Sequence, residues 1–354
     1  MSRQNMFYWQ SDRPFTAEQI NQIFLERKKN FSREEVAAAA SYAMGEKVII
    51  VQDPINQGSV NIVCPFTSTS GREGVIRVHP PQVKNEYFFA EAAAMQAAGK
   101  VNVPVPEVIL VDDSRQHAPF DYMVMTRVPG DVMRPVVEKN PSIHPKYLKQ
   151  IGRYLGYLHT IRPTNYGFFD NSQARDGKLV GIDNTNEEHF LAALDLDEKY
   201  HAENAGELDE KLVSKSLNIL RSNSALAHCK TPTLVHNDIA DWNTVVQGDA
   251  VTGILDWDEC FSGDPVFEFA TLSLFYTDEQ MESIKQGYQE ISTLPVDYEE
   301  KFDFYVMRYI INKSKIAITK IKYAEKTSMR EWLDRAKQKL ERSNTKLTKI
   351  LTKY

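Results

Sequence analysis

Residues 234–265 read LVHNDIADWNTVVQGDAVTGILDWDECFSGDP and place six aspartates between positions 238 and 264. The run TLV leads into a polar loop, TVV leaves it, Gly248-Asp249 predicts a hairpin-like turn, and GILDW returns as a second strand. In this arrangement Asp238 in the loop and Asp256 in the returning strand face each other. Such a concentration of negative charge needs a compensating partner.

Two carboxylates held close together repel each other unless a cation lies between them. Asn243, five positions after Asp238, adds a neutral oxygen ligand for a hard metal ion. Magnesium bound by one or two carboxylates usually keeps positions open for phosphate oxygens, so the pattern indicates phosphoryl transfer. The alternative is that the aspartates only cap helices and turns, but this does not explain Asp256 within an apolar strand pattern.

The segment HNDIADWN (residues 236–243) resembles the HxDxxxxN catalytic loop of the aminoglycoside phosphotransferase and choline kinase-like family, which is protein kinase-like. LDWDECFSGDPVFEFA resembles the metal-binding segment of that family. The loop motif alone is common, but an Asp-Trp pair 13 residues later, followed by Gly-Asp-Pro, makes the combination specific. The resemblance implies that Asp238 orients the substrate hydroxyl and accepts its proton, and that Asn243 and Asp256 bind Mg²⁺.

Three neighbouring residues have structural roles by the same resemblance. His236 is implied to hold the loop through hydrogen bonds, and Asp264 with Pro265 is implied to form a turn. The family usually has Gly where this chain has Asn237. Asn is one of the few other residues that tolerate left-handed backbone angles, so this departure is compatible with the resemblance.

The order of predicted elements is a small α+β lobe followed by a larger, mainly helical lobe. Capping patterns at Thr16 and Ser32 predict two leading helices, residues 47–78 an antiparallel meander, residues 85–98 a helix, and VPEVILVDD and FDYMVMTRVPG two more strands. After Pro145 helical periods dominate, and only residues 234–257 interrupt them with strands. We expect an α+β, bilobal protein kinase-like fold: a nucleotide-binding lobe (1–129), and a lobe with catalytic loop, metal site and acceptor site (130–354), with a cleft between them.

The resemblance also implies phosphate-binding residues in the small lobe. Arg77, in GVIRVH, has the position of the cation that binds phosphate oxygens, although an ordinary exposed strand arginine is the other interpretation. Glu91 has the position of the helix glutamate that orients this cation, with Glu86 as the alternative. Ser59 lies in a turn that corresponds to the loop over the phosphates, but a plain hairpin is equally consistent.

The segment YMVMTRVPG resembles the hinge of the family. The backbone near Met125, Arg127 and Val128 is implied to read the adenine edge, with methionine side chains beside it. Methionines at alternate strand positions are otherwise simply core residues. The expected phosphoryl donor is ATP, and GTP is not excluded.

The charges near the catalytic loop suggest an acceptor. Residues 170–210 contain 12 acidic and 3 basic residues, and Asp241, Asp258, Glu259 and Glu268 lie close to the loop in sequence. This would suit a cationic acceptor such as an aminoglycoside, although acidic surface helices also serve solubility alone. We expect Asp241, Trp242, Asp258 and Glu259 to bind the acceptor, with the indole stacking on a ring.

The segments LVHNDIADWNTVV, GVIRV and YGFFDNSQA resemble those of the hygromycin-type antibiotic phosphotransferases most. This resemblance implies that the γ-phosphate is transferred to an aminoglycoside-like antibiotic and that the protein has a role in antibiotic resistance. Alternative interpretations are a kinase of choline, a sugar or a nucleoside, and a non-catalytic nucleotide-binding protein of kinase fold. Residues 301–354 contain 15 basic and 5 acidic residues, which can indicate nucleic-acid binding. Lysines spaced along an amphipathic helix are more often its solvated face, and we favour that interpretation.

No window approaches 18 consecutive apolar residues, and the first 30 residues lack the apolar core of a secretory signal. We therefore expect a cytoplasmic protein that does not insert into membranes and that is a monomer or a homodimer. The cysteines Cys64, Cys229 and Cys260 are odd in number and lack metal-ligand spacing, so we expect them to be reduced packing residues.

Overall fold

The computed structural model describes residues 32–55, 61–79, 87–192, 194–206, 208–327 and 330–354. Its first helix, α2 (Arg33–Met44), begins at Ser32, whose hydroxyl accepts a hydrogen bond from the backbone N–H of Glu35. This confirms the second predicted leading helix. The first, at Thr16, lies outside the described residues.

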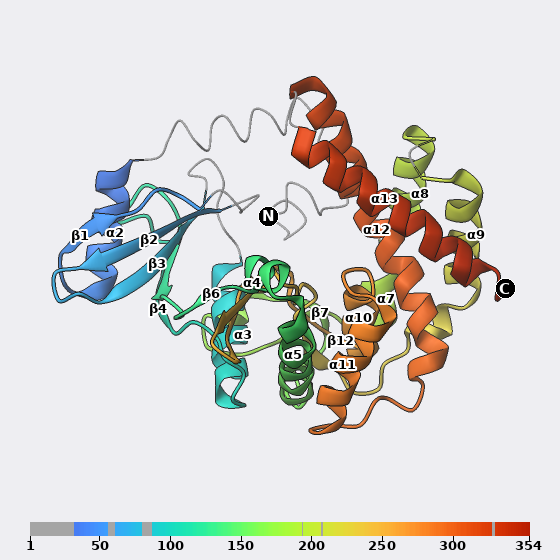
Figure 1. Cartoon of the computed structure of the whole chain (residues 1–354), viewed down its shortest axis with the longest axis horizontal. Coiled ribbons are helices and arrows are strands. Elements are labelled where there is room, and N and C mark those ends of the chain that lie inside the picture. Colours follow the sequence, from blue (N-terminus) through green and yellow to red (C-terminus); the bar gives the residue numbers. More distant parts are fainter. Residues whose placement is uncertain (1–31, 56–60, 80–86, 193, 207, 328–329) are drawn as a thin grey trace.

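A five-stranded antiparallel sheet forms the small part of the fold, with the order β1-β2-β3-β5-β4 (Figure 1). The strands are β1 (Val48–Val51), β2 (Ile62–Ser68), β3 (Glu73–Val78), β4 (Val108–Asp112) and β5 (Tyr122–Thr126). The predicted meander and the two later strands are thus confirmed. Side chains of β5 alternate between two cores, because Tyr122 and Val124 pack with α2 whereas Met123 and Met125 belong to the other core.

Helix α3 (Phe88–Lys100) follows β3 and links the sheet to the rest of the molecule. It ends at Lys100, two residues beyond the predicted end at residue 98. The hydroxyl of Tyr87, at its N-terminus, donates to the carbonyl of Cys260 at 2.6 Å, and the side chain of Asn171 accepts from the backbone N–H of Ala90 at 3.2 Å. The helix predicted for the small lobe therefore also packs on the large one.

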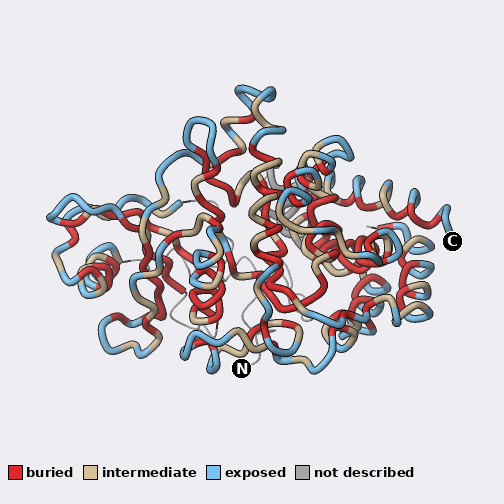
Figure 2. The backbone as a smooth tube through the Cα atoms, turned by 90° about the horizontal axis from the view of Figure 1, so that it is seen from below, coloured by how far each residue is buried: buried red, intermediate tan, exposed pale blue. Residues whose placement is uncertain are grey.

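The large part of the fold is mainly helical, as predicted. Its helices are α4 (Met133–Lys139), η2 (Pro141–Ile143), α5 (His144–Leu158), α6 (Asn171–Ala174), α7 (Asn186–Leu191), α8 (Leu194–Glu203), α9 (Glu210–Ser222), η3 (Ser224–Ala227), η4 (Trp257–Glu259), α10 (Pro265–Leu272), α11 (Asp278–Gln289), α12 (Tyr298–Thr327) and α13 (Arg330–Leu351). Figure 2 shows that buried residues run through the interior while outer helix faces are exposed.

Two small sheets interrupt these helices, and the sequence predicted only part of them. One has the order β11-β10-β6 and the other β8-β7-β12-β9. Their strands are β6 (Asp131–Val132), β7 (Tyr166–Phe169), β8 (Gly181–Asp183), β9 (Thr233–Val235), β10 (Thr244–Gln247), β11 (Ala250–Ile254) and β12 (Phe261–Gly263). The predicted hairpin is β10 and β11, with Gly248 at φ 57° in the turn. The prediction that only residues 234–257 form strands was wrong, because strands of two to four residues are too short to show alternation.

The backbones of helices α5 and α11 approach each other closely at a glycine. The predicted apolar stripe Tyr147, Ile151, Leu155 and Leu158 is buried. On the same helix, an added Cβ at Gly152 would lie 1.9 Å from the carbonyl oxygen of Ile284 on α11. Only glycine permits this approach of the two backbones. Helix α5 also contacts the β10–β11 hairpin, because the hydroxyl of Tyr147 donates to the carbonyl of Gly248 at 2.6 Å.

The prediction of a solvated basic face holds for α13, where Arg335, Lys337, Arg342 and Lys349 are exposed, but it is wrong for much of α12. Lys301, Arg308, Lys313 and Lys315 are buried. Arg308 and Lys315 both pair with the buried Asp197 of α8. The reason is that α12 is surrounded by α8, α9, α10 and α13 and has little face left for solvent (Figure 1).

Two further sequence-based expectations concern cysteines and membranes. Cys64, Cys229 and Cys260 are buried and free, as predicted. Among the helices that the structure describes, none has both the length and the apolar character needed to cross a membrane.

Candidate active site

His236 holds the start of the catalytic loop against the segment after β11. Its Nδ1 accepts from the backbone N–H of Asp238 at 3.3 Å, so Nε2 carries the proton and donates to the carbonyl of Leu255 at 3.1 Å. The ring lies 4.5 Å from that of Trp257. Burial lowers the pKa of His236 to about 3, so the imidazole is neutral and does not act as a cation here.

Glu268 of α10 fixes the next two residues. Its carboxylate accepts the backbone N–H groups of His236 at 2.7 Å and Asn237 at 3.0 Å. Asn237 has φ 71°, a left-handed conformation that Asn tolerates better than most residues. Its side chain accepts from Thr271 at 3.0 Å and donates to Glu259 at 3.1 Å. The loop is therefore held by α10 on one side and by the η4 segment on the other.

Asp238 and Asn243, at the two ends of the loop, are joined directly. The Nδ2 of Asn243 donates to the carbonyl of Asp238 at 2.9 Å and to its Oδ2 at 2.7 Å. The Oδ1 of Asn243 takes part in neither bond. Burial raises the pKa of Asp238 well above its usual value, and the charges of Glu259 and Asp256 add to this effect.

Asp256 lies just beyond the strand in which the sequence placed it. The strand β11 ends at Ile254, and Asp256, with φ 64°, is the N-cap residue immediately before η4. A non-glycine residue in this conformation is strained, and such strain is found at functional sites. The carboxylate is 45% exposed, and its Oδ1 is 3.4 Å from Nη2 of Arg77. The contact joins the five-stranded sheet to the catalytic segment.

Arg77 is buried, which excludes the interpretation as an ordinary exposed strand residue. Its guanidinium forms an ion pair with Glu91 of α3 and lies over the ring of Phe88 at 5.6 Å. Despite burial, the charges of Glu91 and Asp256 raise the pKa of Arg77. Glu91 therefore occupies the predicted partner position, while the alternative Glu86 lies outside the described residues.

The donor atoms fit a magnesium ion. In the described parts of the chain no three His, Cys, Asp or Glu side chains are grouped to hold a metal. Magnesium, however, takes one or two protein carboxylates and leaves its other positions to water and phosphate. Asp256, with the Oδ1 of Asn243, fits that partial set. Partial burial and the charges of Asp256 and Glu91 raise the pKa of Asp258, so a cation would stabilise its ionised form.

The predicted adenine-side residues have different surroundings. Ser59 lies outside the described residues. Met125 is buried in β5 opposite Val75. The side chain of Arg127 pairs with Glu73 at 3.3 Å on the exposed part of the sheet, and that of Val128 lies against Gly253. Only their backbone groups therefore remain as candidates for contact with a nucleotide base.

Asp241 and Trp242, two of the predicted acceptor residues, interact with side chains of other elements of the fold. Asp241 accepts from the hydroxyl of Tyr276 at 2.7 Å and lies 3.2 Å from Nε2 of His144. The ring of Trp242 has the guanidinium of Arg134 above it at 4.4 Å. Asp241 is thus a structural carboxylate, whereas Trp242 forms a partly exposed platform with Arg134.

Asp258 and Glu259, the other two predicted acceptor residues, have different surroundings. Asp258 is partly buried and interacts electrostatically with Asp256 and Glu91. Glu259 is 7% exposed, and its carboxylate is bound by the ammonium of Lys313 and the amide of Asn237. This geometry gives Glu259 a structural role rather than contact with an acceptor.

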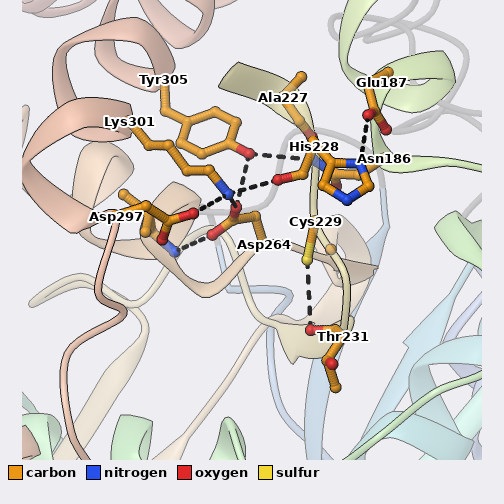
Figure 3. A network of polar contacts seen from close by, with 12 residues as sticks. Asn186, Glu187, Ala227, His228, Cys229, Thr231, Asp264, Asp297, Lys301 and Tyr305 are labelled. Carbon is orange, nitrogen blue, oxygen red and sulfur yellow. Dashed lines mark hydrogen bonds and ion pairs between the residues drawn. The ribbon is translucent and has the colours of Figure 1, made fainter. Parts of the chain in front are cut away.

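The Gly-Asp-Pro turn is structural, as expected (Figure 3). The Oδ1 of Asp264 accepts from the backbone N–H of Val266 at 2.9 Å and caps α10. Its Oδ2 accepts from Lys301 at 2.7 Å and from the hydroxyl of Tyr305 at 3.0 Å. The turn thus anchors α10 to α12.

Sequence reasoning missed Glu268 and Lys313 as residues that position the loop. Both lie in helices rich in apolar residues on several faces, PVFEFATL and YVMRYIINKSKIAI. A charged residue in such a helix is rarely buried without a partner. That pattern was the available signal, but the partners come from distant segments.

Comparisons with known proteins agree with this geometry. Residues 53–338 match the model of the phosphotransferase enzyme family. Among curated proteins no sequence matches significantly. A thermostable mutant of aminoglycoside phosphotransferase APH(4)-Ia, solved with AMP-PNP and hygromycin B, has a similar structure with a TM-score of 0.61 at 17% identity, covering 88% of this chain and 98% of that one.

Two other similar structures are named for other substrates. A putative fructosamine-3-kinase from Thermobifida fusca has a TM-score of 0.61 at 18% identity and covers 88% of this chain and 100% of its own. The macrolide 2'-phosphotransferase MphH from Brachybacterium faecium has a TM-score of 0.56 at 15% identity, with 86% and 97% covered. These likenesses establish a protein kinase-like α+β fold, and, with the match over residues 53–338, the chain belongs to the phosphotransferase enzyme family.

Proposed function

We propose that this protein uses ATP and Mg²⁺ to transfer the γ-phosphate to a hydroxyl group of a small molecule. The observation that carries the proposal is the contact of Arg77 with both Glu91 and Asp256. It brings a fixed cation next to a carboxylate suited to a metal. Asp238, a candidate proton acceptor, interacts electrostatically with that same carboxylate.

The proposed reaction is a direct displacement. The acceptor's hydroxyl oxygen forms a bond to the γ-phosphorus while the bond from that phosphorus to the β–γ bridging oxygen breaks, and ADP leaves with the electron pair. The hydroxyl proton passes to the carboxylate of Asp238. Catalysis in such a site is mainly positioning and charge neutralisation.

Each side chain has a defined part in this scheme. Asn243 holds Oδ2 of Asp238 in place through its amide. Arg77, oriented by Glu91, binds phosphate oxygens. Magnesium bound by Asn243 and Asp256 would neutralise the charge of the phosphates. Backbone groups near Met125, Arg127 and Val128 contact the adenine. We propose further that the enzyme is cytoplasmic and is a monomer or a homodimer.

The acceptor class is the finer part of the proposal. The similar structures carry the names of an aminoglycoside phosphotransferase, a macrolide phosphotransferase and a putative fructosamine kinase. We therefore keep an aminoglycoside-like antibiotic as the first class to test, with choline, sugars and nucleosides as alternatives. At 15–18% identity the neighbours support the fold and do not select among these classes.

Many of the acidic residues that suggested a cationic acceptor instead cap helices or form ion pairs with other residues of the fold. Asp170 caps α6, Asp183 contacts His189, Asp197 pairs with Arg308 and Lys315, and Glu188 completes a capping box. Glu259 and Glu268 are also engaged, as described above. The charge of the acceptor must therefore be decided by other residues.

The test is ATP consumption with Mg²⁺ across aminoglycosides, other antibiotics, nucleosides, choline and amino alcohols. Asp238→Asn should lower acceptor-dependent turnover by roughly 10²–10⁴-fold, the range for loss of a general base. Asp249→Asn is the matched control, because Asp249 lies in the exposed β10–β11 turn and pairs only with Lys146 among the described residues. ATP binding without turnover on any acceptor would instead favour a non-catalytic nucleotide-binding protein.

A further inference from the structure

Arg134 lies between the predicted hinge and the catalytic loop. It belongs to the first turn of α4, which follows β6, and β6 pairs with β10 directly after that loop. The backbone N–H of Arg134 donates to the carbonyl of Asp241 at 3.1 Å. Its guanidinium lies 4.4 Å from the centre of the indole ring of Trp242. Both the backbone and the side chain of Arg134 are therefore attached to the loop that carries Asp238.

We call Arg134 and Trp242 the platform. A second contact holds its indole, because the ring of Phe275 lies 5.0 Å away at an angle of 70°. The next residue, Tyr276, donates its hydroxyl to Asp241 at 2.7 Å. The segment after α10 thus supports the same part of the loop. A side chain that is held in this way loses little conformational entropy when a ligand binds to it.

The platform and the carboxylate of Asp238 belong to one short loop. Trp242 directly precedes Asn243, whose amide donates to Oδ2 of Asp238 at 2.7 Å. Burial raises the pKa of Tyr276, and the charge of Asp238 adds to this shift whereas that of Arg134 opposes it. The two charges therefore act on the same hydroxyl group, in agreement with the contacts. An acceptor whose hydroxyl reaches Asp238 lies beside the platform.

The platform offers hydrogen-bond donors that the fold does not use. Among the described residues, the guanidinium of Arg134 has no hydrogen-bond acceptor or ion-pair partner, and the indole N–H of Trp242 has no acceptor. Both side chains are partly exposed. Guanidinium and indole groups donate hydrogen bonds and accept none, and the planar guanidinium matches two oxygens of a carboxylate or a phosphate. The chemistry of the platform therefore fits an anionic group.

We propose that the acceptor carries a carboxylate or a phosphate group, which Arg134 binds at the platform while the acceptor's hydroxyl lies at Asp238. That this group belongs to the acceptor rests on the proposed phosphotransferase function, but anion binding at the platform does not. A polycationic acceptor would meet a fixed positive charge here and is disfavoured. The competing explanation is that Arg134 only packs on Trp242 and supports the loop.

The first experiment measures thermal unfolding of the full chain over a series of sodium phosphate concentrations, at constant ionic strength. The variants are Arg134→Met, Lys139→Met and Arg77→Met. Lys139 is the matched control, because it is an exposed cation of the same helix, and Arg77→Met removes the cation of the nucleotide site. Phosphate should raise the unfolding temperature of wild type, Lys139→Met and Arg77→Met. The same rise in Arg134→Met should need at least tenfold more phosphate.

A conservative variant separates anion binding from packing. Arg134→Lys keeps the charge without the planar fork, so it should retain part of the phosphate effect, which a role in packing alone does not predict. The proposal is overturned if phosphate stabilises Arg134→Met as much as wild type, or if it does not stabilise wild type. A phosphate effect that is lost only in Arg77→Met also overturns it, because the anion then binds at the nucleotide site.

The second experiment measures ATP consumption with glucose, glucosamine, gluconate and glucose 6-phosphate, which share a polyol and differ in charge. Preference for the anionic members supports the proposal if Arg134→Met raises KM tenfold or more for them alone and Lys139→Met does not. A rise in KM for ATP instead would assign Arg134 to the nucleotide site and overturn it.

The same assay separates failure of this proposal from failure of the phosphotransferase function. Turnover of neutral or cationic acceptors that Arg134→Met leaves unchanged refutes the anionic acceptor and leaves the function intact. Phosphate binding that depends on Arg134, without turnover on any acceptor, counts against the function and retains the anion site.

Discussion

Lys313 of α12 forms a buried ion pair with Glu259, three residues after Asp256. Through the amide of Asn237, which donates to Glu259 at 3.1 Å, the pair reaches the residue before Asp238. A helix close to the C-terminus therefore helps to set the geometry of both the catalytic loop and the metal-binding segment. The position of the two segments depends on packing that neither contains.

Replacing Lys313 with Met should destabilise the protein by about 3–5 kcal/mol, because it leaves the carboxylate of Glu259 buried and unpaired. The double variant Lys313→Met with Glu259→Gln should recover part of this loss. Urea unfolding measures both. Lys349→Met, which removes an exposed 3.6 Å pair with Asp278, should cost less than about 1 kcal/mol. Equal losses in the single and double variants would count against a buried charge as the cause.

Arg77 should control nucleotide affinity. Arg77→Met removes the guanidinium that Glu91 orients, and Arg77→Lys keeps the charge but not the planar fork, so both should weaken ATP binding, by about tenfold or more for Met. Equilibrium binding of a fluorescent ATP analogue measures this. Arg127→Met is the control, because Arg127 pairs with Glu73 on the sheet surface. A control that loses as much affinity as Arg77→Met would place the phosphates elsewhere.

Asn237 combines an unfavourable backbone conformation with useful side-chain bonds. Asn237→Gly should remove the cost of φ 71° but lose the bonds to Thr271 and Glu259, for a net loss of roughly 1 kcal/mol. Asn237→Ala loses the bonds and keeps the strain, so it should be less stable than the Gly variant by about 1 kcal/mol. Denaturant unfolding of both variants gives the comparison. If Ala is as stable as Gly, backbone strain is not significant at this position.

Glu268 should make stability depend on pH. Burial raises the pKa of Glu268 to about 7, although the N–H groups of His236 and Asn237 oppose the shift. The folded chain thus binds a proton more tightly here than the unfolded chain, whose carboxyl has a pKa near 4.5. The associated stability is fully present below pH 4.5 and is lost as the pH rises through 7.

Glu268→Gln should remove this slope and, because the amide accepts only one of the two N–H groups well, cost about 1–3 kcal/mol. Urea unfolding between pH 5 and 8 tests both statements. Glu279→Gln, at an exposed position, should leave the slope unchanged. A slope that persists in Glu268→Gln would assign it to another group.

Local patterns predicted much of the candidate site. The hairpin turn at Gly248 and the pairing of Arg77 with Glu91 were both expected from the sequence. Each depends on residues close in the chain or on a motif with defined spacing. The short strands β7, β8 and β12 were not predicted, because two to four residues carry too little alternation.

The sequence by itself determined the strands and helix of the small lobe, the β10–β11 hairpin, the loop with Asp238 and Asn243, and the segment with Asp256, because turn chemistry and motif spacing are local properties. Only the tertiary structure decided which charged side chains form ion pairs within the fold and which remain available near the catalytic loop. Glu259 is bound within the fold by Lys313, which lies 54 positions later in the chain. Burial and Coulombic partners depend on how distant segments pack, and that information is not contained in any local pattern.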